Sequence, residues 1–175
     1  SFKNGSHLQA GAVLRNMYYK DNIEEKDRIV TGFGVSLSGI WQFAENTSLC
    51  FQGVYGKGIS NYIQDISGSG LDLVPCATAE GKLKAIRAWG GYIGFSHNWC
   101  KALTSNIMYS YARVLDRYGM PATSYKYAQY AAANLFWDFS EYGSCAIEYV
   151  FGRRNDFNKD YGNASRINTM IQYRF

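Results

Sequence analysis

The residues of this chain that could do chemistry are charged side chains that share one phase of an alternating pattern. A row of cations along one surface would concentrate anions, and a narrow aqueous space screens fixed charge less than an open surface does. Such a row favours selective passage of anions, unless several members are solvated near loops or paired with carboxylates. The candidate lining residues are Arg15, Lys82, Lys84, Lys126, Asp138, Glu148, Arg154, Arg166 and Arg174.

Signatures of catalysis are missing from the sequence. There is no Gly-x-Ser-x-Gly nucleophile elbow, and Gly56-Lys57-Gly58 lacks the rest of a phosphate-binding loop. His97 shares the phase of Phe95 and Trp99, which predicts a place on an aromatic surface and disfavours a Ser–His–acid arrangement. We therefore expect no enzyme and no cofactor.

The cysteines give no metal-binding pattern. An even number of them would allow two disulfides, but no C-x-x-C pair is present and the spacing favours no pairing. We expect mostly unpaired thiols that behave as small hydrophobic side chains, and no metal site. The four residues are Cys50, Cys76, Cys100 and Cys145.

The elements that would position the charged row are β-strands. Aromatic residues make up 17% of the chain, with 18 Gly and only 2 Pro, a composition typical of all-β proteins. Polar and apolar residues alternate with period two, which places them on opposite faces of a strand. The predicted strands are about His7–Met17, Thr31–Phe43, Ser48–Lys57, Lys82–Trp99, Thr104–Val114, Tyr125–Phe139, Gly143–Arg153 and Arg166–Phe175.

The predicted connections alternate between short and long along the chain. This alternation puts every long loop at one end of the sheet, as in outer-membrane barrels, and places both chain ends at the short-turn end. The short joins are about Glu45–Thr47, Cys100–Leu103 and Ser140–Tyr142. The long joins are about Tyr18–Val30, Ile59–Gly81, Leu115–Ser124 and Arg154–Asn163.

Aromatic residues fall near both ends of the predicted strands, all at the phase opposite the charged row. Two such belts around an apolar band are expected at the two interfaces of a membrane. A soluble barrel would turn these rings inward, but the opposite phase holds Gly, Ser, Asn, Gln and Ala, which would make a poor core. The net charge of +4 is too mild to indicate a nucleic-acid partner.

The join Ile59–Gly81 is long for a hairpin connection and carries acidic residues, among them Asp65 and Asp72. Folded inward, it would face the basic wall and narrow a channel; left outside, it would be an ordinary surface loop. The neighbouring glycines Gly90, Gly91 and Gly94 indicate close approach of another backbone or side chain, a bend, or a plain local weakness.

Several segments from about Thr31 onward have a distinctive order and spacing. They are Ser48–Ile63, Leu71–Pro75, Lys82–Ala85, Trp89–Phe95, Gly152–Arg154 and Tyr173–Phe175. In that order they resemble the DcaP-like outer-membrane porins, and the terminal Phe resembles the assembly signal of outer-membrane barrels. The resemblance implies a larger, trimeric barrel that passes small and often anionic solutes, with this chain matching its C-terminal half.

The sequence therefore predicts an all-β fold: an antiparallel transmembrane β-barrel, an up-and-down meander with eight strands in this chain, half of a barrel of about 16 strands. Residues 1–175 would form the C-terminal part of a porin in the bacterial outer membrane, with lipid, small polar or anionic solutes and two further copies as partners. The alternative is a complete eight-stranded barrel with a structural or adhesive role.

Overall fold

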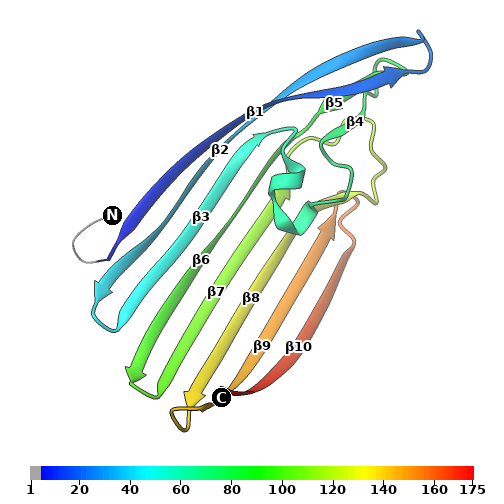
Figure 1. Cartoon of the computed structure of the whole chain (residues 1–175). Coiled ribbons are helices and arrows are strands. Elements are labelled where there is room, and N and C mark those ends of the chain that lie inside the picture. Colours follow the sequence, from blue (N-terminus) through cyan, green and yellow to red (C-terminus); the bar gives the residue numbers. More distant parts are fainter. Residues whose placement is uncertain (1–4) are drawn as a thin grey trace.

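The computed structural model describes residues 5–175. It contains an eight-stranded antiparallel sheet whose strands lie side by side in the order in which they occur in the sequence (Figure 1). The predicted all-β, up-and-down fold is therefore confirmed. The strands of this sheet are β1 (His7–Asp21), β2 (Lys26–Ala44), β3 (Thr47–Lys57), β6 (Arg87–Cys100), β7 (Leu103–Val114), β8 (Tyr125–Asp138), β9 (Gly143–Asp156) and β10 (Tyr161–Tyr173).

The sheet is open within the part of the chain that the structure describes. The first and last strands, β1 and β10, each pair with one neighbour and not with each other. β1 begins and β10 ends at the same end of the sheet, beside the short turns, as the sequence predicts (Figure 1). Among the described residues, no helix combines the length and the apolar character needed to cross a membrane.

Alternation along the strands gives the sheet two chemically different faces. One, which we call the aromatic face, presents large apolar side chains to the surroundings: Trp41 is 58% exposed, Trp137 53% and Ile171 83%. Other exposed members of this face are Phe33, Tyr55, Trp89, Phe95, Trp99, Ile107, Tyr149 and Ile167. Their outward position follows the orientation expected of a wall that contacts hydrocarbon.

The segment between β3 and β6 folds back over the opposite face, which we call the loop-covered face (Figure 1). This segment, residues 58–86, contains two short 3-10 turns, η1 (Ser60–Tyr62) and η2 (Gln64–Ile66). It also contains a small hairpin of β4 (Leu73–Pro75) and β5 (Leu83–Ala85). Of the two positions that the sequence left open for this loop, the structure has the one in which the loop lies against the face that carries the charged row.

Small residues on the wall make this packing possible. Gly34, Gly56 and Ala88 are successive register partners on β2, β3 and β6, and they form a flat floor under Ile59. A Cβ atom on Gly34 would lie 3.0 Å from a methyl carbon of Ile59, and one on Gly90 would lie 3.1 Å from a methyl carbon of Ile63. The predicted close approach at Gly90 is therefore confirmed.

The core of the molecule lies between this floor and the folded-back segment. Because the wall contributes small side chains, the segment supplies the bulky ones, and burial of each isoleucine contributes about 1.5–3 kcal/mol. The face that the sequence analysis considered a poor core is a core where the loop covers it. The buried apolar cluster comprises Ile59, Ile63, Ile66, Leu71, Val74, Ile86, Ala88, Ala112, Val114, Met120 and Tyr125.

The extents of two predicted joins and the start of one predicted strand are wrong. The joins expected over Tyr18–Val30 and Arg154–Asn163 are tight turns at 22–25 and 157–160, because the flanking strands stay paired up to Asp21 and Lys26 in one hairpin and up to Asn155 and Tyr161 in the other. The strand expected from Lys82 begins at Arg87. Its first residues do alternate as a strand, but they pair with β4 and not with the main sheet.

Candidate functional site

The loop-covered face holds most of the charged residues that the sequence singled out. Arg15 on β1 points toward the folded-back segment, where its Nη1 donates to Asp72 Oδ2 at 2.8 Å. Asp72 also accepts a hydrogen bond from Ser60 Oγ at 2.8 Å. The expected encounter between an acid of the loop and a base of the wall therefore occurs, and the two charges compensate each other.

Arg154 on β9 is also paired. Its Nε lies 2.9 Å from Asp156 Oδ1, and its guanidinium carbon lies 5.6 Å from the centre of the Tyr125 ring. Lys126 lies on β8 between Tyr125 and Tyr127, where the register with β9 shifts. Arg166 on β10 is exposed and opposite Val150. Neither Lys126 nor Arg166 forms an ion pair within the described part of the chain.

Lys82 and Lys84 lie outside the main sheet, in the long connection before β6. Lys82 Nζ is 3.7 Å from Glu24 Oε1, next to the turn at 22–25. Lys84 Nζ lies 5.3 Å from the centre of the Tyr118 ring. These two lysines border a hollow beside Arg28 at the long-loop end of the sheet, so they occupy a rim and not the wall.

The predicted acids differ in their surroundings. Asp138 is exposed at the end of β8, opposite Ser144. Glu148 on β9 lies between two amides: Asn134 Nδ2 donates to one carboxylate oxygen at 3.3 Å and Asn168 Nδ2 to the other at 2.9 Å. Amide donors stabilise the carboxylate without cancelling its charge, so Glu148 remains a fixed negative group.

These contacts belong to a polar ladder that the sequence analysis did not identify. Asn106 on β7 donates to Asn134 Oδ1 at 2.8 Å, so hydrogen bonds run from β7 through β8 and β9 to Asn168 on β10. The residues share one phase in the sequence, but only the register shows that they are directly opposite one another. The ladder offers amide donors and acceptors to polar molecules along this face.

Further contacts fix the loops at the long-loop end. Tyr125 Oη donates to Asp65 Oδ2 of the folded-back segment at 2.8 Å. The guanidinium of Arg87 binds Asp116 with Nη2–Oδ1 at 2.6 Å and Nε–Oδ2 at 3.0 Å. Hydrogen bonds from Arg87 hold the pKa of the Asp116 carboxyl below its usual value. The segment and the 115–124 loop are thus tied to the wall by polar contacts as well as by the core.

All four cysteines are free in the structure. Cys76, in the folded-back segment, differs from the others because its Sγ lies 3.3 Å from Thr78 Oγ1. This hydrogen bond, together with the nearby Lys84 charge, lowers the pKa of the Cys76 thiol to about 7.

The arrangement gives little support to a catalytic centre. His97 lies opposite Thr47 and packs edge-on against Trp99 on the aromatic face, with its Nδ1 2.8 Å from Thr47 Oγ1, as its phase predicted. In residues 5–175, His, Cys, Asp and Glu side chains form no group of three or more that could hold a metal ion. What the face can do is present charges and amides to molecules that move along it.

Comparison with known proteins gives the class of the fold. An up-and-down sheet with outward aromatics and long loops at one end is the arrangement found in the walls of outer-membrane β-barrels. The fold resembles that in the crystal structure of the outer membrane channel DcaP of Acinetobacter baumannii, with a TM-score of 0.77 and 19% sequence identity. The match covers 99% of this chain and 49% of the DcaP chain, so this chain spans about half the length of that channel. No protein-family model and no curated protein matches the sequence.

The expected resemblance to DcaP-like porins is therefore confirmed at the level of the fold. The structural neighbour is a channel and not an enzyme, and half coverage agrees with the predicted half-barrel. At this sequence identity the likeness concerns architecture and not activity.

Proposed function

We propose that this chain forms part of the wall of a diffusion channel for small hydrophilic solutes in the bacterial outer membrane. The observation that carries the proposal is the two-sided wall: exposed rings on one face, and polar groups beneath an inward-folded loop on the other. A closed barrel with this orientation would meet lipid outside and water inside. The likeness of the fold to an outer membrane channel supports the same conclusion.

Transport in such a channel is diffusion, with no covalent step. Solutes would move along the loop-covered face, where the folded-back segment narrows the passage and the polar ladder exchanges hydrogen bonds with them. Selectivity in a pore follows from its width, its donors and acceptors, and its fixed charges. The role of this chain's residues would therefore be to line the passage, to position the constricting segment and to set the local potential.

We further propose that the channel prefers anions over cations. This preference is smaller than the number of basic residues alone would suggest. Arg15 and Arg154 are each paired with an aspartate, which removes much of their influence on a passing solute. Lys126 and Arg166 remain as candidate lining cations. At the rim, Lys84 would attract anions toward the entrance, while Lys82 is paired with Glu24. Asp138 and Glu148 oppose this effect.

The unpaired outer edges of β1 and β10 support a larger barrel, since a lone edge exposes a row of unsatisfied backbone groups. Further strands that close the wall would bring the total to about 16, the size at which a barrel leaves an aqueous channel. The alternative of a complete eight-stranded barrel is disfavoured because these eight strands do not close. We propose a homotrimer as the assembly, which native mass spectrometry of the intact gene product would measure.

The test is conductance of the intact gene product in a planar bilayer. Discrete ion-conducting steps are expected, with a reversal potential in a salt gradient that indicates anion preference. The double substitution K126Q/R166Q should lower the anion-over-cation permeability ratio. The matched control is Lys101→Gln, which removes a cation from the short turn between β6 and β7.

A silent bilayer would contradict the channel. If K126Q/R166Q conducts in discrete steps with an unchanged anion-over-cation permeability ratio, these two side chains lie outside the permeation path. That result would contradict the lining proposal but not the channel.

A further inference from the structure

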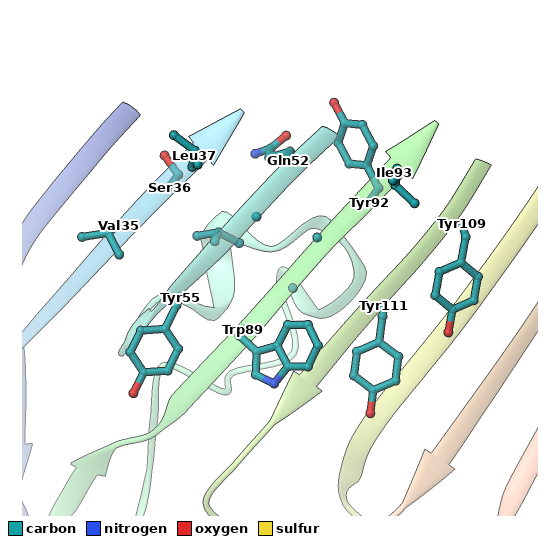
Figure 2. Close-up of a pocket in the computed structure, with 14 residues that line it drawn as sticks. Val35, Ser36, Leu37, Gln52, Tyr55, Trp89, Tyr92, Ile93, Tyr109 and Tyr111 are labelled. Carbon is teal, nitrogen blue, oxygen red and sulfur yellow. The ribbon is translucent and has the colours of Figure 1, made fainter. Parts of the chain in front are cut away.

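The aromatic face carries a hollow that the channel function does not use. It lies across β2, β3, β6 and β7 and has a volume of about 960 Å³ (Figure 2). Small-molecule pockets commonly enclose about 300–1,000 Å³. The outward-facing side chains around it are apolar or aromatic, and they include Val35, Leu37, Tyr55, Trp89, Ile93 and Tyr111.

Two glycines that face each other form the floor of the hollow. Gly53 on β3 is the register partner of Gly91 on β6, so neither strand projects a side chain outward at this point. A Cβ atom on Gly91 would lie 2.4 Å from the carbonyl oxygen of Gln52, which means that the strand geometry requires glycine there. A Cβ atom on Gly53 would meet nothing within 4 Å, so the space above Gly53 is open.

A row of rings borders the hollow toward the long-loop end. Tyr55, Trp89 and Tyr111 lie side by side on β3, β6 and β7 (Figure 2). The rings of Trp89 and Tyr111 are stacked with centroids 4.9 Å apart, and Tyr127 continues the stack at 5.5 Å from Tyr111. Rings packed in this way form a rigid, apolar side wall.

Directly beyond the rings, at the same phase, lies a row of cations: Lys57, Arg87, Arg113 and Arg153. Lys57 and Arg87 are register partners, and Arg113 is opposite Trp89. Each cation is the next residue on the aromatic face after a ring of the same strand, toward the long-loop end.

Among the described residues, Asp116 is the only carboxylate that forms an ion pair with a member of this row, and it binds Arg87. Arg113 forms no ion pair in residues 5–175, and its buried Nε has no hydrogen-bond partner there. Arg153 uses its Nε on Asn155 Oδ1 and lies 4.2 Å from the centre of the Tyr161 ring, but it has no carboxylate partner in the same range. The row therefore has uncompensated positive charge next to an apolar hollow.

We propose that this surface binds a phosphorylated glycolipid of the outer leaflet, with one acyl chain in the glycine-floored hollow and a phosphate on Arg113 and Arg153. The inference rests on the proposed membrane position, because it requires the aromatic face to meet lipid. Guanidinium groups bind phosphate through charge-assisted, often bidentate hydrogen bonds. An apolar hollow directly followed by uncompensated cations matches a molecule with an apolar tail and an anionic head.

A two-fold contact with a second copy of this chain fits the surface less well. Two copies that met through the same patch would bring their cation rows together, and like charges placed opposite each other are unfavourable. A phosphorylated lipid would supply negative charge to the cation row without bringing two cation rows together.

The test measures binding of purified lipid A, with both phosphates, to the detergent-solubilised intact gene product by native mass spectrometry. The variant R113Q/R153Q is expected to bind about tenfold more weakly, a change of about 1.4 kcal/mol. Wild type should show a similar loss with lipid A from which both phosphates have been removed. Gly53→Leu should weaken binding of both lipids, because the leucine side chain fills the open space above the floor.

Two controls separate these effects from general ones. Lys101→Gln removes a cation at the opposite end of the sheet, and Gly162→Leu adds a side chain on β10 where a Cβ atom meets nothing within 4 Å. Both should bind lipid A as wild type does. Because binding is measured in detergent, a silent bilayer in the conductance experiment would count against the channel and not against this site.

Three outcomes would overturn the lipid site. They are equal binding of the phosphorylated and dephosphorylated lipids by wild type, unchanged binding by R113Q/R153Q, and unchanged binding by Gly53→Leu. A change of oligomeric state in Gly53→Leu with unchanged lipid binding would assign the hollow to a contact between copies instead.

Discussion

At the scale of single residues, the main feature of the candidate lining is charge compensation. Arg15 has the right residue type and phase for an anion-attracting wall, yet Asp72 meets it at 2.8 Å. The pair is partly shielded from solvent, with the side chains 27% and 14% exposed, so water screens it less than an open surface pair. Its effect is to hold the folded-back segment against β1 while lowering the net charge at this point.

We expect Asp72→Asn to raise the anion-over-cation permeability ratio. The amide keeps the size of the carboxylate and can still accept from Ser60, but it no longer neutralises Arg15. The reversal potential in a salt gradient measures the change. Asp160→Asn, at the exposed turn between β9 and β10, is the control and should leave the ratio unchanged. An unchanged ratio in Asp72→Asn would place Arg15 outside the permeation path.

Cys76 should be alkylated faster than the other three cysteines at neutral pH. Its pKa of about 7 means that the reactive thiolate increases as the pH rises through 7, whereas an ordinary thiol ionises near about 8.5. Iodoacetamide labelling followed by peptide mass spectrometry gives the rate at each pH. Thr78→Val removes the hydrogen bond and should move the midpoint of the profile to higher pH. Equal rates at all four cysteines would contradict the prediction.

At the scale of elements, the wall and the folded-back segment are complementary in size. Gly34, Gly56 and Ala88 leave space that Ile59 fills, and Gly90 leaves space for Ile63. Neither the wall nor the folded-back segment would form a dense core by itself. The wall has small side chains at these positions, and the segment has no long helix or strand. The position of the folded-back segment therefore depends on packing between two elements that are separated along the chain.

Ile66→Ala should loosen the packing of the folded-back segment against the wall. Ile66 in η2 is completely buried, and truncation of such a side chain costs about 2–5 kcal/mol of packing stability. We expect faster cleavage of the segment by an added protease and a larger, noisier single-channel conductance. Ile23→Ala at the turn 22–25 is the control, because Ile23 is 57% exposed. Unchanged cleavage in Ile66→Ala would mean that the polar contacts alone hold the segment in place.

At the scale of the whole molecule, the two faces of the sheet differ in chemistry, and each suits a different environment. The aromatic face presents rings near both ends of the strands, and the loop-covered face presents amides and charges. The outer edges of β1 and β10 are unpaired in the described structure, so these eight strands form an open sheet and not a closed barrel.

Tryptophan fluorescence tests the orientation of the wall. All four tryptophans, Trp41, Trp89, Trp99 and Trp137, are at least 38% exposed on the aromatic face. In vesicles, brominated acyl chains should therefore quench most of the emission, while iodide in the aqueous phase should quench little. Strong quenching by iodide without quenching by bromolipid would overturn the membrane orientation.

The sequence by itself determined the fold class and the two faces. Strict alternation, as in Ile167, Thr169 and Ile171 against Arg166 and Asn168, is a local property of an extended chain, so the face of each residue follows from its phase. The short turns could be located for the same reason, because a hairpin join lies between two adjacent alternating segments.

Only the tertiary structure decided which residues act together. Alternation indicates a strand but not its partner, so Leu83–Ala85 was expected in the wall and pairs with β4 instead. The pairing of Arg15 with Asp72 and the ladder through Asn134 and Glu148 join residues far apart in sequence. Such contacts depend on strand register and on where a long loop folds, and both are set by packing across the whole sheet.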